Sequence, residues 1–414
     1  MIRTTPTLLC LLISSSFAGA ADLPSAGPRD AGFSAERLTR IDQTLSGWVS
    51  DGKYSGISAA IIRDGNFVYR ESFGKRDRET GAPVAEDTIF RIYSMTKPIV
   101  SAAAMMLHEQ GRFLLDDPVS KYLPGFDDVR VLADENRDGK DAATVPLDGA
   151  ITIEHLLTHT SGLSNSAAYA RENVFDRSLP LEAMARRIVT VPLAHQPGRG
   201  WRYATSIDVL GRLVEIWSGK TLDVYLEESI FKPLGMPDTG FWVSAEKLSR
   251  TAKIDTLDEN GNLVPFPRAD DPGKKPAFFS GGGGLYSTVG DYARFSQMLL
   301  NEGELDGVRL LAPKTVRTMR MNQVPHDVLP PNGPNGRVGY GFGYGGAVLM
   351  DVAASQQLAS KGEYNWGGMA GTYFWIDPVE RIIGLYFVQR PPFVPQPPKT
   401  FKTLVYQALI ESSH

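Results

Sequence analysis

The sequence predicts an α+β protein in which both ends of the chain build one antiparallel sheet around an inserted, mainly helical region. Two observations carry this prediction: β-rich runs occur at 58–70 and again after 340, and the patterns between them are mainly helical. Strands at both ends of a chain with helices between them are typical of this fold class. We expect a discontinuous sheet domain over 21–85 and 320–414, flanked by N- and C-terminal helices, and a helical domain over 86–319.

Residues 1–20 are typical of a secretory signal peptide. Arg3 supplies positive charge, residues 8–17 form an apolar core, and Ala18-Gly19-Ala20 is an A-x-A cleavage site. That core is shorter than the about 20 residues of a spanning helix. We therefore expect a periplasmic or secreted protein that begins at Ala21 and has no membrane span.

The composition excludes several function classes. The only cysteine, Cys10, lies in the predicted signal, so the mature chain would have no disulfide, thiol nucleophile or cysteine metal site. The formal net charge of −4 gives no reason to expect a nucleic-acid partner. With 42% hydrophobic and 22% charged residues, the chain has the composition of an ordinary soluble globular protein.

The sheet segments show the clearest local patterns. Ser34 is expected to cap a helix with an apolar stripe formed by Leu38, Ile41, Leu45 and Trp48. Asp64-Gly65 separates two β-rich runs, which is a strong hairpin signal. Strands are expected at 340–350, 372–376 and 382–388, the last two paired across Asp377-Pro378. A final helix is expected over 401–409, after a proline-rich loop at 391–398.

The middle of the chain shows helical spacing of apolar residues. The expected helices lie at 181–189, 209–217, 222–230 and 292–300. The stretch 132–150 is a candidate for shaping the mouth of a cleft.

Ser94-Met95-Thr96-Lys97 opens the apolar stretch 98–107 and is the most informative motif of the chain. In a helix, residues three apart share a face, so the Ser94 hydroxyl and the Lys97 amine can meet. Both would lie near a helix N-terminus, which favours developing negative charge. This pattern suits a serine nucleophile activated by lysine.

Two further segments offer the groups that such a nucleophile needs. Tyr203 lies in a loop before a helix, and an adjacent lysine cation would favour its phenolate, so it is a candidate proton relay. The glycines that follow Trp366 would let backbone N–H groups approach a ligand closely.

Four motifs together resemble the serine β-lactamase-like superfamily and, within it, the family VIII carboxylesterases. They are FRIYSMTKP at 90–98, LDDPVSKYLP at 115–124, IEHLLTHTSGL at 153–163 and WGG at 366–368. The resemblance covers nearly all of the mature chain and implies the fold of class C β-lactamases and D,D-peptidases.

The resemblance also implies roles for individual residues. Ser94 would be the acylated nucleophile, and Lys97 and Tyr203 would accept and relay its proton, with the first base left open. The backbone N–H groups of Ser94 and Met369 would form the oxyanion hole. No metal or organic cofactor is expected, and the partner would be a small-molecule ester.

Two departures from the β-lactamase pattern favour an ester substrate. Trp366-Gly367-Gly368 stands where β-lactamases have Lys-Thr-Gly, so a cation and a hydroxyl that suit a ligand carboxylate are missing. Thr205 stands where β-lactamases have asparagine, which removes an amide that could hold an acylamide. We therefore expect hydrolysis of short-chain carboxylic esters.

Alternative functions remain at this point. The chain could be a β-lactamase or a D-alanyl-D-alanine peptidase, an acyltransferase, or a non-catalytic ligand-binding domain of the same fold. A Ser-His-Asp mechanism is disfavoured because the sequence has no G-x-S-x-G elbow. His155 and His159 have zinc-like spacing but no HExxH pattern, and we expect His159 to hydrogen-bond at a helix end.

Overall fold

The computed structural model describes residues 22–137, 139, 141–164 and 167–413, with Ala167 described for its backbone alone. The predicted signal peptide, 1–20, lies outside the described residues.

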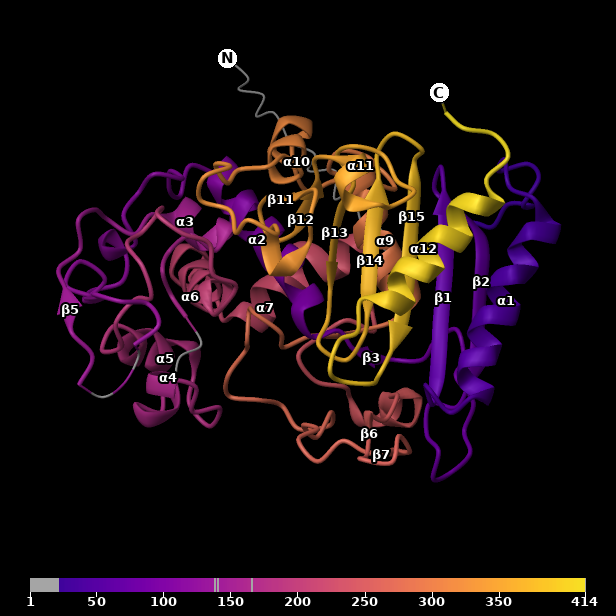
Figure 1. Ribbon diagram of the computed structural model, residues 1–414, viewed down its shortest axis with the longest axis horizontal. Helices are drawn as coiled ribbons and strands as arrows, with labels where there is room; N and C mark the ends of the chain where they lie inside the picture. Colours follow the sequence, from indigo (N-terminus) through magenta and orange to yellow (C-terminus); the bar gives the residue numbers. More distant parts are fainter. Residues whose placement is uncertain (1–21, 138, 140, 165–166, 414) are drawn as a thin grey trace, which may run out of the picture.

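A seven-stranded antiparallel sheet joins the two ends of the chain, in the order β11-β12-β13-β14-β15-β1-β2 (Figure 1). The N-terminal strands are β1 (Gly56–Arg63) and β2 (Asn66–Gly74). The C-terminal strands are β11 (Tyr340–Phe342), β12 (Ala347–Leu349), β13 (Tyr364–Gly367), β14 (Tyr373–Asp377) and β15 (Ile382–Val388). β15 pairs with β1 in a register that places Ile57 opposite Val388. The predicted α+β class with an antiparallel sheet is confirmed.

Helices cover both faces of this sheet. α1 (Ala35–Ser50) and α12 (Gln396–Ala408) contact each other on one face, and α9 (Val289–Leu300) packs on the other face against β1, β14 and β15. β1 serves both layers, because Ile57 and Ile61 join the cluster under α1 and α12, whereas Ala60 and Ile62 join the main core. This alternation follows from the two-residue period of a strand.

The expected local signals hold at several points. The Ser34 side chain accepts a hydrogen bond from the Arg37 N–H at 3.2 Å, so it caps α1 as expected. Asp64 and Gly65 have φ of 49° and 79°, the left-handed values that a two-residue hairpin turn requires. β14 and β15 pair across the expected turn.

Two expectations at the C-terminal end need correction. The segment 340–350 forms two short strands, because residues 343–346 turn back between β11 and β12. The proline-rich segment 391–398 is not all loop, since α12 begins at Gln396 with proline in its first turn, where no backbone N–H is needed.

The helical region lies to one side of the sheet (Figure 1). Its helices are α2 (Thr96–Glu109), α3 (Ile153–Thr158), α4 (Ala167–Arg171), α5 (Leu181–Ile188), α6 (Ser206–Ser218), α7 (Leu222–Leu226) and α8 (Lys232–Leu234), with a π-helical turn at Glu227–Phe231 between the last two. α2 is buried almost throughout and packs against α6. The domain limits at 85 and 320 stay a prediction; α9, from within that interval, packs on the sheet.

Short elements connect these layers. The two-stranded pairs are β3 (Phe90–Arg91) with β8 (Tyr286–Ser287), β4 (Val131–Leu132) with β5 (Thr144–Val145), β6 (Asp255–Leu257) with β7 (Leu263–Pro265), and β9 (Glu304–Leu305) with β10 (Val308–Arg309). The short helices are η1 (Tyr93–Met95), η2 (Val119–Lys121), η4 (Ala245–Arg250), α10 (Pro313–Met319), η5 (Pro334–Gly336) and α11 (Val352–Ser355).

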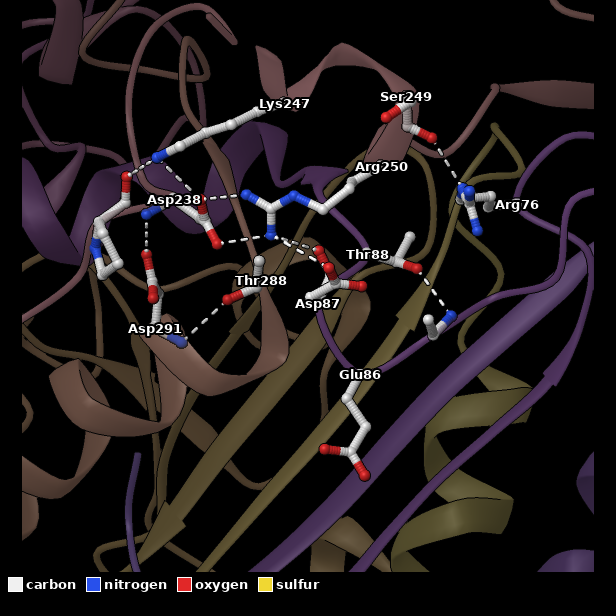
Figure 2. A network of polar contacts seen from close by, with 12 residues as sticks. Arg76, Glu86, Asp87, Thr88, Asp238, Lys247, Ser249, Arg250, Thr288 and Asp291 are labelled. Atoms are coloured by element: carbon white, nitrogen blue, oxygen red, sulfur yellow. Dashed lines mark hydrogen bonds and ion pairs between the residues drawn. The ribbon is translucent and has the colours of Figure 1, made fainter. Parts of the chain in front are cut away.

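A polar network ties η4 to the segment before β3 and to the start of α9 (Figure 2). Arg250 donates to the Asp238 carboxylate at 2.8 Å and to the Asp87 carbonyl at 3.0 Å. The Asp238 N–H in turn donates to the Asp291 carboxylate at 2.8 Å. In the part of the chain described here, no helix is both long and apolar enough to cross a membrane.

Candidate active site

Ser94 lies in the 3₁₀ turn η1, directly before α2, so the tetrad opens a helix as the sequence indicates. Its neighbour Tyr93 has a φ of 44°, a left-handed value that is uncommon for a residue with a large side chain. Backbone strain of this kind concentrates at functional sites, where the surrounding structure enforces it. Ser94 is half-buried at the surface of the core.

Lys97 brings its amine to the Ser94 hydroxyl. Its side chain is buried, and Nζ lies 3.2 Å from Ser94 Oγ and 2.6 Å from the Gly282 carbonyl oxygen. Nζ also lies 4.6 Å from the centre of the Tyr203 ring, a cation–π distance. The structure thus brings Tyr203 to the segment that carries Ser94 and Lys97, so the three residues come together from two separate parts of the chain.

Trp366 is buried against Tyr203. Its indole Nε1–H donates to the Tyr203 hydroxyl oxygen at 3.1 Å, and the two rings lie 5.1 Å apart. The Trp366 side chain is only 4% exposed. A donor aimed at the phenol oxygen stabilises negative charge there.

His159 also contacts the Tyr203 ring, and in the described part of the chain its side chain does not make the hydrogen bond expected at the helix end. Both ring nitrogens are buried without a hydrogen-bond partner within the described residues. The ring instead lies 4.8 Å from the Tyr203 ring, and the His159 carbonyl accepts the Arg202 N–H at 2.9 Å. Burial, and then the Lys97 charge, lower the pKa of His159 well below its usual value, so the imidazole is neutral.

Gly368 fits closely against the turn that carries Ser94. A Cβ at this position would overlap the Ile92 carbonyl oxygen and the Thr372 hydroxyl, so a glycine is required. Met369 follows it and is 42% exposed. Within the described part of the chain, the N–H groups of Ser94 and Met369 donate to no protein acceptor.

The turn at 280–284 and Asp208 are parts of the site that sequence reasoning missed. Gly282, in the glycine run 281–284, supplies the carbonyl acceptor for Lys97. The Asp208 carboxylate, from the first turn of α6, accepts hydrogen bonds from Ser280 Oγ at 2.6 Å and from the Gly282 N–H at 3.0 Å. No short motif marks a carbonyl as a ligand, because every residue has one.

Residues 40–406 match the family model described as Beta-lactamase. The chain belongs to the beta-lactamase family. The expected membership of the serine β-lactamase-like superfamily is thereby confirmed.

Individual relatives of this beta-lactamase-family protein include an esterase. The chain is 38% identical over 355 residues to Protein Rv1367c of Mycobacterium tuberculosis, covering 82% of this chain and 87% of that one. It is 33% identical over 392 residues to Esterase EstB of Burkholderia gladioli, covering 87% and 91%. Among solved structures it is similar to EstCE1, a hydrolase with promiscuous acyltransferase activity, with a TM-score of 0.77 and 29% identity over 90% of this chain and 99% of that one. The protein is a serine hydrolase of the β-lactamase fold.

A cavity of about 520 Å³ lies beside the turn at 280–284. Phe241 and Phe278 contribute its apolar wall, and Arg91 and Arg177 lie on its polar side, where both contact the Asp270 carboxylate at 3.2 Å. Across the described residues, no cluster of three or more histidine, cysteine, aspartate or glutamate side chains could hold a metal ion.

The stretch 132–150 reaches the neighbourhood of Tyr203 at one point. It includes the pairing of β4 with β5, and Glu135 between these strands lies 3.4 Å from Arg202, next to Tyr203. Both side chains of this ion pair are exposed, so the contact lies at the surface and not in the core of the site.

Proposed function

We propose that this protein is an exported carboxylesterase that cleaves short-chain esters through an acyl-enzyme on Ser94. The observation that carries the proposal is the connected set formed by Ser94, Lys97, Tyr203 and Trp366. Lys97 contacts the Ser94 hydroxyl, its amine lies against the Tyr203 ring, and Trp366 donates to the Tyr203 oxygen. This is the arrangement of a nucleophile, a base and an oriented proton relay.

Acylation begins when Ser94 Oγ attacks the ester carbonyl and Lys97 accepts the hydroxyl proton. Lys97 takes this first proton in our proposal because its amine lies within hydrogen-bond reach of Ser94 Oγ. The negative charge on the tetrahedral intermediate is stabilised by the N–H groups of Ser94 and Met369, which have no protein acceptor within the described residues. The carbon–oxygen bond to the alcohol then breaks, and Tyr203 passes the proton from Lys97 to the leaving oxygen.

Deacylation repeats these steps with water. Water loses a proton to Tyr203 and Lys97 and attacks the acyl carbon, and Ser94 Oγ leaves with that proton as the carboxylic acid is released. The indole N–H of Trp366 stabilises negative charge on the Tyr203 oxygen while the proton is away. No metal or organic cofactor takes part in this scheme.

The lining of the site supports a neutral ester over a β-lactam or a D-alanyl peptide. Trp366 occupies the first position of the Lys-Thr-Gly segment and is buried against Tyr203, so this position offers no cation for a substrate carboxylate.

Hydrolysis of p-nitrophenyl butyrate by the mature protein tests the proposal. We expect activity in the wild type, with losses of about 10³-fold or more in Ser94→Ala and Lys97→Ala and of about 10²-fold in Tyr203→Phe. A chromogenic cephalosporin assayed in parallel should react much more slowly than the ester. Full ester hydrolysis by Ser94→Ala would overturn the mechanism, and a faster cephalosporin rate would overturn the substrate class.

A fluorophosphonate probe separates an enzyme from a non-catalytic binding domain of the same fold. Because such probes phosphonylate activated serines with loss of fluoride, we expect labelling of the wild type at Ser94 and none of Ser94→Ala. Failure of the wild type to react would favour the binding domain.

Acyl transfer is a second candidate, favoured by the similarity to EstCE1, which is described as a hydrolase with promiscuous acyltransferase activity. An acyl-enzyme can be opened by an alcohol in place of water. Product analysis with vinyl butyrate and an added alcohol should show a new ester beside butyric acid, and butyric acid alone would exclude this activity.

Export predicts a mature N-terminus at Ala21, which N-terminal sequencing of the secreted protein would check.

A further inference from the structure

Two buried ionisable side chains flank one glycine in the candidate active site. Lys97 is 4% exposed and Asp208 is 6% exposed. Neither enters an ion pair with another side chain within the described residues. A buried polar side chain is costly without hydrogen-bond partners, so each of the two needs polar groups close to it.

Gly282 hydrogen-bonds both side chains, Asp208 and Lys97. Its N–H donates to Asp208 Oδ1 at 3.0 Å, and its carbonyl accepts Lys97 Nζ at 2.6 Å. Ser280 Oγ donates to the same Asp208 oxygen at 2.6 Å, and the Gly284 N–H closes the turn on the Ser280 carbonyl at 2.8 Å. The Asp208 carboxylate therefore accepts hydrogen bonds from two residues of this turn, and the turn binds the Lys97 amine through the Gly282 carbonyl.

The Asp208 carboxylate packs closely against Gly282. A Cβ on this residue would lie 2.6 Å from Asp208 Oδ2, closer than real Cβ contacts. Asp208 itself is fixed in the first turn of α6, the helix that follows the Tyr203 loop. The first turn of α6 is therefore linked both to the turn at 280–284, through Asp208, and to the preceding segment that carries Tyr203.

We propose that Asp208 is a positioning residue for catalysis, which holds the turn whose Gly282 carbonyl anchors the Lys97 amine. This inference rests on the proposed function, because it assigns Asp208 a part in presenting Lys97 to Ser94. Without the anchor, the Lys97 amine would not be held 3.2 Å from the Ser94 hydroxyl. Misplacement of a catalytic group by about 1 Å can cost about 100-fold in rate.

Steady-state kinetics on p-nitrophenyl butyrate with two variants test the proposal. Asp208→Asn keeps an oxygen acceptor but loses the charge, and we expect kcat to fall by about 10-fold. Asp208→Ala loses both, and we expect kcat to fall by about 100-fold. In both variants KM should stay within about threefold of the wild type, because Asp208 lies behind the turn and touches no substrate.

Asp223→Asn is the matched control. Asp223 is a buried carboxylate on the neighbouring helix α7, and it pairs with Lys275 at 3.0 Å, away from Lys97. We expect its kcat to equal that of the wild type. Thermal unfolding of each variant shows whether it is folded; if Asp208→Ala is not, the more conservative Asp208→Asn decides.

Each outcome has one meaning. An unchanged kcat in Asp208→Asn, a rise in KM alone, or an equal loss of kcat in Asp223→Asn overturns the role of Asp208. Ser94→Ala, assayed beside them, keeps this result separate from the proposed function. If Ser94→Ala is inactive while the Asp208 variants equal the wild type, only the positioning role fails; if Ser94→Ala is active, the proposed function itself fails.

Discussion

Lys97 and Tyr203 depend on neighbours that are not themselves charged. The Lys97 amine contacts a hydroxyl, a carbonyl oxygen and the face of a ring, and Tyr203 contacts the rings of Trp366 and His159. The low dielectric of such a buried site strengthens each of these contacts. Single substitutions that remove one contact and keep the side-chain volume should therefore change rate more than stability.

Trp366→Phe tests the contact to the Tyr203 oxygen. The phenylalanine keeps an aromatic ring but cannot donate a hydrogen bond, so we expect kcat on p-nitrophenyl butyrate to fall by about 10-fold, with KM little changed. Trp217→Phe is the control, because Trp217 lies in α6, is also buried and stacks on Phe113 at 3.9 Å. An unchanged kcat in Trp366→Phe would show that the indole N–H has no part in the reaction.

His159 should act as a ring and not as an acid or base. Both of its nitrogens lack partners within the described residues, and its pKa is held well below the usual value, mainly by burial. We expect His159→Phe to keep kcat within about threefold, and His159→Ala to lose about 10-fold because Tyr203 loses a packing surface. If the two variants are equally impaired in steady-state assays, an imidazole nitrogen is needed after all.

At the scale of elements, α12 is joined to the strand that leads into Trp366 by a buried ion pair. Lys402 Nζ lies 2.6 Å and 2.8 Å from the two carboxylate oxygens of Glu363, and both side chains are almost fully buried. The Asn365 amide donates to the same carboxylate at 2.7 Å. Such a pair fixes one arrangement of helix and strand, because each charge is costly without the other.

Lys402→Met should lower the free energy of unfolding by about 3–5 kcal/mol, since it leaves the Glu363 carboxylate buried without its counter-charge. Glu363→Gln should have a similar cost, and the double variant should cost less than the sum of the two. Urea unfolding measures all three. Lys399→Met is the control, because Lys399 is exposed on the same helix and should change stability by less than about 0.5 kcal/mol. Additive costs in the double variant would contradict this account.

At the scale of the whole molecule, the sequence predicts the elements better than their contacts. The helix after Ser34, the Asp64-Gly65 hairpin and the strand at 382–388 follow from local patterns, and the structure confirms them. The division of 340–350 and the start of α12 were missed, because each depends on a turn or a helix N-terminus where local signals compete.

The site likewise contains residues that the sequence predicts and residues that it does not. The motifs identify Ser94, Lys97, Tyr203 and Trp366, and the structure brings all four side chains together. Asp208 and Gly282 could not be predicted, because they act through a backbone carbonyl and a long-range packing contact that leave no pattern in the sequence.

The start of α9 gives the whole molecule a pH-dependent stability. Asp291 is 6% exposed and accepts hydrogen bonds at 2.8 Å from the Asp238 N–H and from Thr239 Oγ1. Figure 2 shows the contact with Asp238. Burial raises the pKa of Asp291 to about 7, against about 3.9 in an unfolded chain. The folded state then holds a proton that the unfolded state has released, in the window between pH 4 and 7.

Stability attributable to Asp291 should therefore fall as the pH rises from about 4 to about 7, because the unfolded state binds fewer protons there. The pKa difference corresponds to about 4 kcal/mol over the whole window. Asp291→Asn cannot titrate but keeps a side-chain oxygen for both donors, so its unfolding free energy should lack this decline. Urea unfolding of both proteins at a series of pH values isolates the effect: the difference between them should change steadily from pH 4 to 7 and be constant above 7. Two parallel curves would mean that Asp291 is ionised throughout in the folded protein, and that the network at the start of α9 stabilises its charge despite burial.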